Sequence, residues 1–449
     1  MKFVYIASTV AVIAAAAPHN AAIMAYPLAP QSRSLPTHNL VGYWHNFDNP
    51  SGKTYPISQV SKDWDVINVA FAVNNGSGNV GLVLDPAAGS EDQFIADIKS
   101  LKAAGKTVVL SLGGQDGSVS LGDATETANF VASVTGLIKK YGFDGIDLDL
   151  ENGVSQGLPI INNLISAVKQ VKQNVGPNFY LSMAPEHPYV QGGYATYGGI
   201  WGAYLPIIDG LRDELTQIHV QFYNNGGFTY TDGRTLNEGT VDALVGGSLM
   251  LIEGFKTNYG TGWEFKGLRP DQVSFGVPSG PKSANRGFVT PEVVKNTLTC
   301  LVQGTGCDTI KPKQPYPTYR GVMTWSINWD KYDNYVFSKP ARQALDNLGN
   351  VGPTPSTPTP ATTQPTTPAP VVTPPPATPK PTTPQPTTAP VVTPTPATPE
   401  PTSAPVVTPT PSSNKCDGKT GVCYWPQNKQ VLPFGESDCK LFTEFVWCP

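Results

Sequence analysis

Short apolar runs rich in branched residues alternate with longer amphipathic stretches between residues 38 and 349. Apolar runs of about four to eight residues are typical of buried strands, and apolar positions three and four apart are typical of helices that cover a sheet. The runs predict strands at 40–44, 65–73, 106–112, 142–150, 179–185, 215–223, 273–278 and 320–327. The amphipathic stretches predict helices at 91–104, 125–141, 160–175, 240–255, 291–301 and 339–348.

Strands that alternate with helices along a chain usually form a parallel sheet with helices on its faces. Eight strands in about 310 residues favour an α/β fold, a closed (β/α)8 TIM barrel, with a doubly wound open sheet as the alternative. No glycine-rich phosphate loop follows the first predicted strand, so nothing in the sequence recommends a nucleotide site there.

The segments outside 38–349 differ from it in composition. In residues 1–17, Lys2 precedes an apolar run that ends in alanines, which is typical of a secretory signal peptide. Residues 18–37 form a short N-terminal extension. Residues 350–414 hold 22 of the 45 prolines, and the sequence Ala-Pro-Val-Val-Thr-Pro recurs three times in them. This composition predicts an extended Pro/Thr-rich linker that cannot build a packed core.

Charge and cysteine content narrow the classes of function. The chain has a net charge of −4 and only 14% charged residues, against about 25% in typical soluble proteins. Nucleic acids and anionic membrane surfaces are bound by basic patches, so we expect neither as a partner. Six cysteines, an even number, and the signal peptide predict a secreted, extracellular protein with disulfides, and we expect it to be a monomer.

The most informative run is 141–151, which contains four acids within eight positions. Alternate side chains of a strand share a face, so Asp147, Asp149 and Glu151 should point into the barrel and the apolar residues between them toward the helices. Glu151 would then lie at the carboxyl end of the strand, where barrels of this kind carry their chemistry. Burial and neighbouring like charges should raise the pKa of Glu151 and make it a general acid.

Two other interpretations compete for this acidic run. Carboxylates bind Mg²⁺ or Ca²⁺, but no histidine or further aspartate cluster accompanies these acids, so we expect neither a metal nor another cofactor. A solvent-facing strand would also carry acids, but the apolar residues between them are typical of a buried barrel strand.

Asp144, Asp147, Asp149 and Glu151 form an Asp-x-x-Asp-x-Asp-x-Glu motif that resembles the signature of family 18 glycoside hydrolases, the chitinases. The motif lies on the fourth predicted strand, as it does in that family. Similar family motifs lie on five other predicted strands, at 41–44 (Val-Gly-Tyr-Trp), 111–114 (Ser-Leu-Gly-Gly), 182–186 (Ser-Met-Ala-Pro-Glu), 221–224 (Gln-Phe-Tyr-Asn) and 323–325 (Met-Thr-Trp). The resemblance covers the whole of 38–349.

The resemblance implies a secreted chitinase that hydrolyses β-1,4 linkages between N-acetylglucosamine units of chitin or chito-oligosaccharides. In this family the acetamido oxygen of the substrate attacks the anomeric carbon, and the configuration is retained. Glu151 would protonate the glycosidic oxygen, Asp149 would orient the acetamido group, and Asp147 would hold Asp149. The Tyr223 hydroxyl would hydrogen-bond the same acetamido group, and Asp144 would shape the start of the strand.

The resemblance also implies a set of substrate-contacting residues: Gln221, Trp325, Met183, Tyr43, Phe71, Asn224 and Glu186. Only about 45 residues separate positions 278 and 325, which is too few for the α+β insertion domain that many chitinases carry there. We therefore expect a barrel without that domain, an open cleft and cleavage within polymer chains.

Two other functions fit the same family resemblance. One is an endo-β-N-acetylglucosaminidase that acts on N-glycan cores, and the other is a non-catalytic chitin-binding lectin. Such lectins usually lack the acid, whereas Glu151 is present here.

The cysteines fall into a local pair and a C-terminal group. Cys300 and Cys307 predict a disulfide that closes a short loop, with buried free thiols as the alternative. Cys416, Cys423, Cys439 and Cys448 predict a small disulfide-rich module over 415–449, although sequence cannot choose among three pairings and zinc is the rival ligand. The module looks like a carbohydrate-binding module, whose candidate sugar contacts are Tyr424, Trp425 and Trp447; the alternative is that these aromatics form its core.

Overall fold

The computed structural model describes residues 35–349, 416, 418–425, 430–432 and 446–449. They belong to two compact units, one within 1–353 and one within 354–449, and each is considered by itself. The predicted signal peptide, most of the N-terminal extension and the predicted linker lie outside the described residues.

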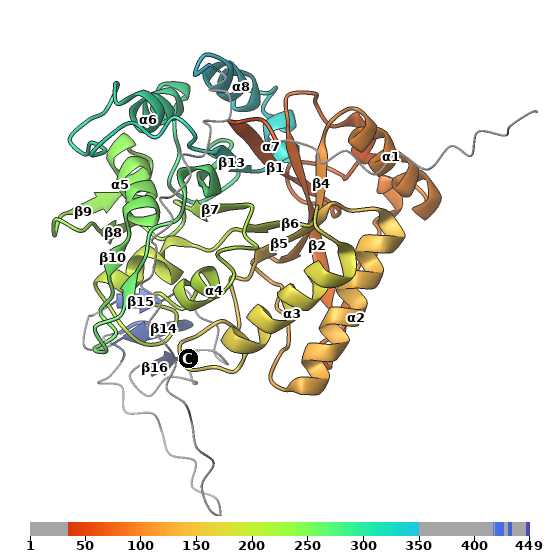
Figure 1. The fold of residues 1–449 in the computed structure, drawn as a ribbon, viewed down its shortest axis with the longest axis horizontal. Coiled ribbons are helices and arrows are strands. Elements are labelled where there is room, and N and C mark those ends of the chain that lie inside the picture. The colour runs from red at the N-terminus through yellow and green to blue at the C-terminus, as the bar shows by residue number, and fades with distance from the viewer. Residues whose placement is uncertain (1–34, 350–415, 417, 426–429, 433–445) are drawn as a thin grey trace, which may run out of the picture. The chain divides into compact units, whose positions relative to one another are not determined.

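The first unit is a closed barrel of parallel strands surrounded by helices (Figure 1). Its strands are β1 (Asn39–His45), β2 (Val66–Asn74), β4 (Thr107–Gly113), β5 (Gly145–Asp149), β6 (Tyr180–Met183), β7 (Gln217–Gln221), β12 (Val273–Pro278) and β13 (Gly321–Trp325). Each pairs in parallel with the next, and β13 pairs with β1 through Asn39 and Gly321, which closes the ring. The (β/α)8 prediction is therefore confirmed, and the open sheet is excluded.

Helices cover the outside of the barrel: α1 (Glu91–Ala103), α2 (Ala124–Tyr141), α3 (Ile160–Val175), α4 (Leu205–Gly210), α5 (Val241–Glu253), α6 (Pro291–Gln303), α7 (Ile327–Tyr332) and α8 (Ser338–Asp346). Local chemistry sets the ends of several of them. The Asp123 side chain accepts a hydrogen bond from Glu126 N at the start of α2, and Gly142 ends the helix in the left-handed conformation. The six predicted helices are present, with ends within two residues of those predicted.

Shorter elements complete the unit. β3 (Val80–Gly81) pairs with β2, and two hairpins, β8 (Gly227–Thr229) with β9 (Thr235–Asn237) and β10 (Phe255–Lys256) with β11 (Glu264–Phe265), flank α5. Single turns of 3₁₀ helix lie at Ile57–Gln59, Pro86–Ala88, His187–Tyr189, Gln191–Tyr194 and Pro270–Gln272.

The segment between β12 and β13 is short, as the sequence predicted. It contains α6 and the disulfide Cys300–Cys307, with the two Cα atoms 4.8 Å apart, and its residues, all of them described, form no strand. The predicted local disulfide is confirmed, and the α+β insertion domain is absent from this segment.

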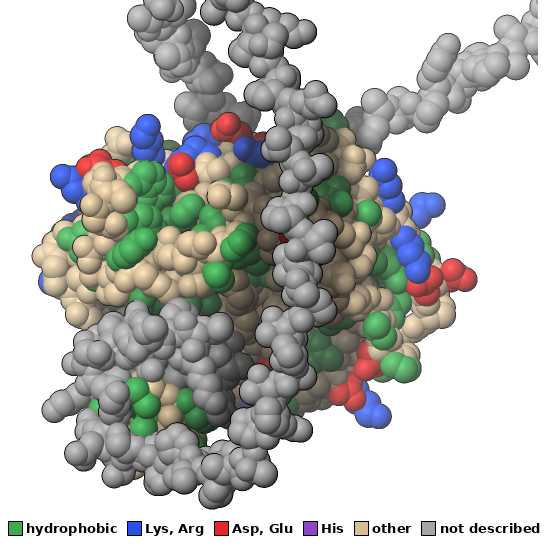
Figure 2. Space-filling view, turned by 90° about the horizontal axis from the view of Figure 1, so that it is seen from below, with side chains coloured by type: hydrophobic (Ala, Val, Ile, Leu, Met, Phe, Trp, Pro, Cys, Tyr) green, Lys and Arg blue, Asp and Glu red, His purple; other side chains and the backbone are tan. Residues whose placement is uncertain are grey.

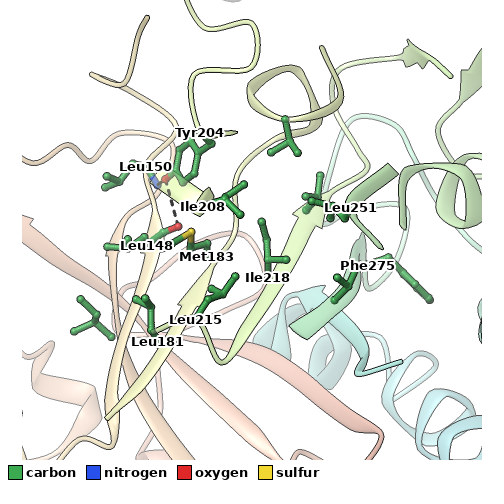
Figure 3. Packing of buried hydrophobic residues seen from close by; sticks show 14 of the residues in the cluster. Leu148, Leu150, Leu181, Met183, Tyr204, Ile208, Leu215, Ile218, Leu251 and Phe275 are labelled. Carbon is green, nitrogen blue, oxygen red and sulfur yellow. Dashed lines mark hydrogen bonds between the residues drawn. The ribbon is translucent and has the colours of Figure 1, made fainter. Parts of the chain in front are cut away.

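Side chains of the strands form two layers because alternate residues face opposite sides. Leu148, Leu150, Met183 and Ile218 face outward and pack in the main hydrophobic core beneath the helices (Figure 3). A smaller apolar cluster that includes Tyr43 lies inside the barrel. On the face seen in Figure 2, basic side chains lie mostly along the margins, interspersed with acidic ones.

In the second unit, the described residues form a small antiparallel sheet. Its strands β14 (Val422–Trp425), β15 (Gln430–Leu432) and β16 (Val446–Cys448) run in the order β15–β14–β16. A disulfide joins Cys416 to Cys448, with the Cα atoms 5.8 Å apart, so this disulfide of the predicted module is present.

The aromatic and cysteine predictions for this unit meet different outcomes. Tyr424 is only 1% exposed, which favours the core role, whereas Trp447 is half-buried. The side chains of Cys423 and Trp425 and the whole of Cys439 lie outside the described residues. Across both units, none of the helices described has the length and apolar character of a membrane span.

Candidate active site

The acidic row lies on the inner face of β5 and just beyond its end. Asp147 is 0% exposed and Asp149 is 3% exposed, and both side chains point into the barrel. Glu151 follows the strand by two residues and is half-buried. Leu148 and Leu150 join the outer core, so the alternation predicted from the sequence is confirmed.

Asp147 receives hydrogen bonds from three other strands, β1, β4 and β6. Oδ2 accepts from the Tyr43 hydroxyl at 2.8 Å and from the Ser111 hydroxyl at 2.7 Å, and Oδ1 accepts from the Ser182 hydroxyl at 2.6 Å. His219 Nε2 lies 3.4 Å from Oδ1. Burial by itself would raise the pKa of Asp147, but the contacts with His219, Ser182 and Ser111 outweigh it and hold this pKa below its usual range.

A single amide holds the other two acids together. Gln221 Nε2 lies 2.9 Å from Asp149 Oδ1, 3.1 Å from Glu151 Oε1 and 2.9 Å from the Ala184 carbonyl oxygen, and it donates to all three. The Asp149 carboxyl also hydrogen-bonds Glu151. The two carboxyl groups therefore belong to one hydrogen-bonded unit and exchange protons as a pair.

Both members of this pair bind protons more tightly than ordinary acids do. Burial, followed by the charges of Glu151, Asp147 and Glu186, raises the pKa of Asp149 well above its usual range. Burial also raises the pKa of Glu151, against the opposing hydrogen bonds from Gln221 and Asp149. The row thus combines one acid of lowered pKa, Asp147, with two acids of raised pKa, which suits Glu151 to general acid catalysis.

Two tyrosines outside the barrel fix the backbone that carries the row. The Tyr204 hydroxyl accepts from Leu150 N at 3.0 Å and lies 3.4 Å from the Leu148 carbonyl oxygen, to which it donates (Figure 3). The Tyr189 hydroxyl donates to the carbonyl oxygen of Glu151 at 2.6 Å. The bonds to Leu150 N and to the Glu151 carbonyl oxygen satisfy backbone groups at the end of the strand and so hold the acid in place.

The row opens into a cavity of about 550 Å³ at the carboxyl ends of the strands. Aromatic rings form one wall: Phe71 stacks on Trp325 with ring centroids 5.7 Å apart, and Phe47 stacks on Phe71 at 6.3 Å. Tyr223 lines the same cavity, is 6% exposed, and has a raised pKa because of burial and the nearby acids. A mixed surface of rings, amides and carboxyls is suited to a sugar.

Two glycines allow this close assembly. A Cβ atom on Gly113 would lie 2.1 Å from the Asp149 carbonyl oxygen, and one on Gly114 would lie 2.6 Å from the Phe71 ring. Both residues also have positive φ angles, which glycine adopts without steric cost. Gly114 N donates to the Asp149 carbonyl oxygen at 2.7 Å, so this turn joins β4 to the end of β5.

Comparison with known protein families assigns the barrel and its acidic motif to the same family. The family described as "Glycosyl hydrolases family 18" matches residues 39–285, which is more than half of the chain. The chain belongs to glycosyl hydrolase family 18.

The family includes relatives with similar barrels. The chain is 44% identical to "Chitinase Chi52" of Paenibacillus xylanexedens over 325 residues, which are 69% of this chain and 62% of that protein. It is 42% identical to "Chitinase D" of Niallia circulans over 324 residues, with the same two shares. A crystal structure of a family GH18 chitinase from Chromobacterium violaceum has 62% identity and a TM-score of 0.69, covering 70% of this chain and 86% of that one. The chain thus spans less than two thirds of the two bacterial relatives.

Within this family 18 barrel, most of the predicted site residues come together. The predicted site residues that line the cavity are Tyr43, Phe71, Asp149, Glu151, Gln221, Tyr223, Asn224 and Trp325. Asp147 lies beneath them, out of reach of the cavity. Asp144 lies at the opposite end of β5, where it accepts from Val108 N at 2.9 Å and pairs with Lys102 at 2.8 Å.

Glu186 lies beside the row, outside the cavity lining. Asn225 Nδ2 donates to its Oε1 at 2.7 Å. Burial and the charge of Glu151 raise the pKa of Glu186 to about 7. Its position therefore supports an electrostatic influence on the acids more directly than contact with a sugar.

Met183 is a correction to the sequence prediction. The Ser182 hydroxyl points inward to Asp147, so the next residue on β6 must point outward. Met183 is 0% exposed and packs in the outer core with Leu148 and Ile218, away from the cavity (Figure 3). Its neighbour Ala184 faces the barrel interior instead.

Sequence reasoning did not assign roles to four residues that the structure places at or beneath the site. Ser111, Ser182 and His219 surround Asp147, and Asp116 lines the cavity and raises the pKa of Glu151 by its charge. Ser111 and Ser182 lie within the family motifs, and His219 precedes Gln221 by two positions. Strand alternation was therefore the signal that could have placed these side chains on the inner face of the barrel. Among the described residues, no group of three or more His, Cys, Asp or Glu side chains is placed to hold a metal ion.

Proposed function

We propose that this protein is a chitinase that cleaves β-1,4 linkages between N-acetylglucosamine units with retention of configuration. The observation that carries the proposal is the buried row of Asp147, Asp149 and Glu151, which opens into the cavity and has pKa values shifted in opposite directions. Asp147 is held ionised, whereas burial raises the pKa of Asp149 and of Glu151. Membership of a family with relatives named as chitinases supports the substrate class.

In this proposal each residue acts from the position that it occupies. Glu151 protonates the glycosidic oxygen, and the acetamido oxygen of the sugar attacks the anomeric carbon as the glycosidic bond breaks. Asp149 and Tyr223 orient the acetamido group and stabilise the positive charge that develops on it. Trp325 supplies an aromatic surface under the distorted sugar.

We propose further that the enzyme cleaves within chains and acts outside the cell. No insertion domain deepens the cleft between β12 and β13, so a long polymer can enter from the side. The disulfide Cys300–Cys307 is of a kind that persists in oxidising compartments. Product mixtures of many lengths early in digestion would support internal cleavage, and disaccharides alone from the first minutes would contradict it.

The decisive experiment compares the wild type with Glu151→Gln on colloidal chitin and on chito-oligosaccharides. The amide keeps the shape of Glu151 and its contact with Gln221 but cannot give up a proton to the leaving oxygen. We expect kcat to fall by about 10²- to 10⁴-fold with a small change in KM. Full activity of the variant would refute the proposed mechanism.

Two controls define the outcome. Glu264→Gln removes an exposed carboxylate from the β10–β11 hairpin and should leave kcat unchanged. A high-mannose glycopeptide tests the N-glycan alternative, and its cleavage in preference to chito-oligosaccharides would replace chitin as the substrate. Binding of chitin without any hydrolysis by the wild type would favour the lectin.

A further inference from the structure

We propose that His219 is a positioning residue of the carboxylate row, the fixed hydrogen-bond donor that keeps Asp147 ionised and leaves the proton of the row on Asp149 and Glu151. This inference deepens the proposed function and rests on it for its consequences in catalysis. The placement of protons around His219 is testable without turnover.

The geometry places His219 directly under the row. It lies on β7, is 0% exposed, and faces the barrel interior two residues before Gln221. Its Nε2 atom is 3.4 Å from Asp147 Oδ1 and 3.3 Å from the Tyr43 hydroxyl oxygen. Because the Tyr43 hydroxyl donates to Asp147 Oδ2 at 2.8 Å, its oxygen is free to accept from Nε2. Both neighbours of Nε2 are therefore acceptors.

The other ring nitrogen decides which nitrogen of the imidazole keeps a proton. His219 Nδ1 is buried and has no hydrogen-bond partner. A proton on Nδ1 would be a buried donor without an acceptor, which costs free energy. An unprotonated Nδ1 is a buried acceptor without a donor, which costs less. Of the two tautomers with a single ring proton, the structure thus favours the one that carries it on Nε2.

This asymmetry distinguishes His219 from the other donors to Asp147. The hydroxyls of Tyr43, Ser111 and Ser182 can each rotate and accept a hydrogen bond from a protonated Asp147. His219 could accept only by moving its proton to the unpartnered Nδ1. It is therefore the one contact of Asp147 among the described residues that cannot reverse its direction.

Among the described titratable groups around Asp147, His219 alone is a base and can donate a hydrogen bond through an N–H group. Five other titratable groups interact electrostatically with Asp147. They are Tyr43 on β1, Asp149 on β5, Tyr180 on β6, Tyr204 before α4 and Tyr223 after β7. All of them are acids, and none supplies a positive charge. With Asp147 held as an anion by fixed donation, a proton entering the row is retained by Asp149 or Glu151, where the reaction uses it.

The test compares His219→Leu, which removes the donor, with His219→Gln, which keeps an N–H group at a similar reach. Without the donor, the pKa of Asp147 rises, so Asp147 takes up a proton at higher pH and the acid limb of the kcat–pH profile moves upward. We expect His219→Leu to lower kcat by about ten- to hundredfold with KM within about twofold. His219→Gln should restore most of kcat and the wild-type acid limb.

A spectroscopic measurement on the full-length wild type completes the test. The chain has five histidines, and ¹⁵N-histidine labelling with His219→Gln assigns the resonances of His219. We expect Nε2 to carry a proton across the pH range of activity. The Nδ1–H tautomer, or an acid limb that stays in place in His219→Leu while only thermal stability falls, would each overturn the inference. A wild type without activity on chitin would instead refute the proposed function and leave the tautomer measurement valid.

Discussion

At the scale of single residues, the site depends on one amide between two acids. Gln221 donates to both Asp149 and Glu151, so neither carboxyl group can titrate without affecting the other. Asp149 needs both a proton and the contact with Gln221, because burial and the neighbouring charges oppose its ionisation.

Replacing Asp149 by Asn tests this dependence. The amide keeps the size of the side chain but cannot take a negative charge when the acetamido group becomes positive. We expect kcat on chitotetraose to fall by about 10²- to 10³-fold with little change in KM. A variant that loses affinity but keeps kcat would mean that Asp149 only binds the sugar.

The same variant should be more stable than the wild type at neutral pH. A carboxyl whose pKa is higher in the folded than in the unfolded protein destabilises the fold as pH rises above the unfolded value of about 3.9. Asp149 is such a group, and an uncharged amide in its place would remove the penalty. Thermal unfolding should show a higher Tm for Asp149→Asn near pH 7, with the difference vanishing in acid; an equal or lower Tm near pH 7 would contradict this.

Asp116 should set part of the pH dependence of the acid. Its charge raises the pKa of Glu151, and activity is lost as pH rises through that pKa because the acid must be protonated. Asp116→Asn should therefore move the alkaline limb of the kcat–pH profile to lower pH, and added salt should weaken the difference. Asp213→Asn is the matched control, since Asp213 is exposed before β7, at the opposite end of the barrel. An unmoved alkaline limb in Asp116→Asn would exclude the electrostatic role.

Sequence alone could place the acids but not their partners. Alternation along one strand fixes the face of Asp147 from its own neighbours. The donors Ser111, Ser182 and His219 come from three other strands, and their meeting depends on the register of the closed barrel, in which Ser111 and Ser182 both pair with Asp147. That register is set by the packing of the whole sheet, so no single run of sequence contains it.

At the scale of elements, β6 illustrates how a motif can mislead. The run Ser182–Glu186 resembles a family motif, yet its members face different sides of the sheet. Ser182 and Ala184 face the interior, whereas Met183 belongs to the outer core. Assigning a motif to a site therefore requires the strand phase as well as the sequence.

Substitutions of Met183 test this phase. Met183→Ala should lower the free energy of unfolding by about 2–5 kcal/mol, because it leaves a cavity in the outer core. Met183→Leu preserves the volume and should cost less than about 1.5 kcal/mol. In both variants, KM for chito-oligosaccharides measured well below the unfolding transition should match the wild type. A large rise in KM in the folded Met183→Leu variant would return Met183 to the substrate site.

The elements that sequence could not predict share a physical reason. α4 and α7 have six residues each, too few for a helical period to repeat, and tertiary contacts stabilise them. The predicted strand 142–150 is longer than β5 (Gly145–Asp149) because apolar residues continue past the last ladder bond. Long helices with a clear period, such as α3, were predicted to the residue.

At the scale of the whole molecule, the chain joins a barrel that is suited to hydrolysis to a second, small disulfide-bonded unit. A tethered module that binds the polymer would raise the concentration of the barrel at an insoluble surface, and the predicted linker would set the reach. The low charge of the chain fits a neutral polymer, because few charged groups would have to lose water on contact.

Deleting 415–449 tests whether the second unit contributes binding. The barrel is a compact unit of its own, so the shortened chain should retain kcat and KM on soluble chito-oligosaccharides. Its adsorption to insoluble chitin, measured by depletion from solution, should fall by about tenfold or more, since a second attachment adds avidity without changing the catalytic site. Trp447→Ala in the full chain should reproduce part of that loss, because Trp447 is half-buried and keeps some exposed surface. Tyr424→Phe should leave adsorption unchanged, because Tyr424 is only 1% exposed. Adsorption that stays the same after the deletion would assign polymer binding to the barrel cleft alone, and the aromatic residues of the second unit would then serve its core.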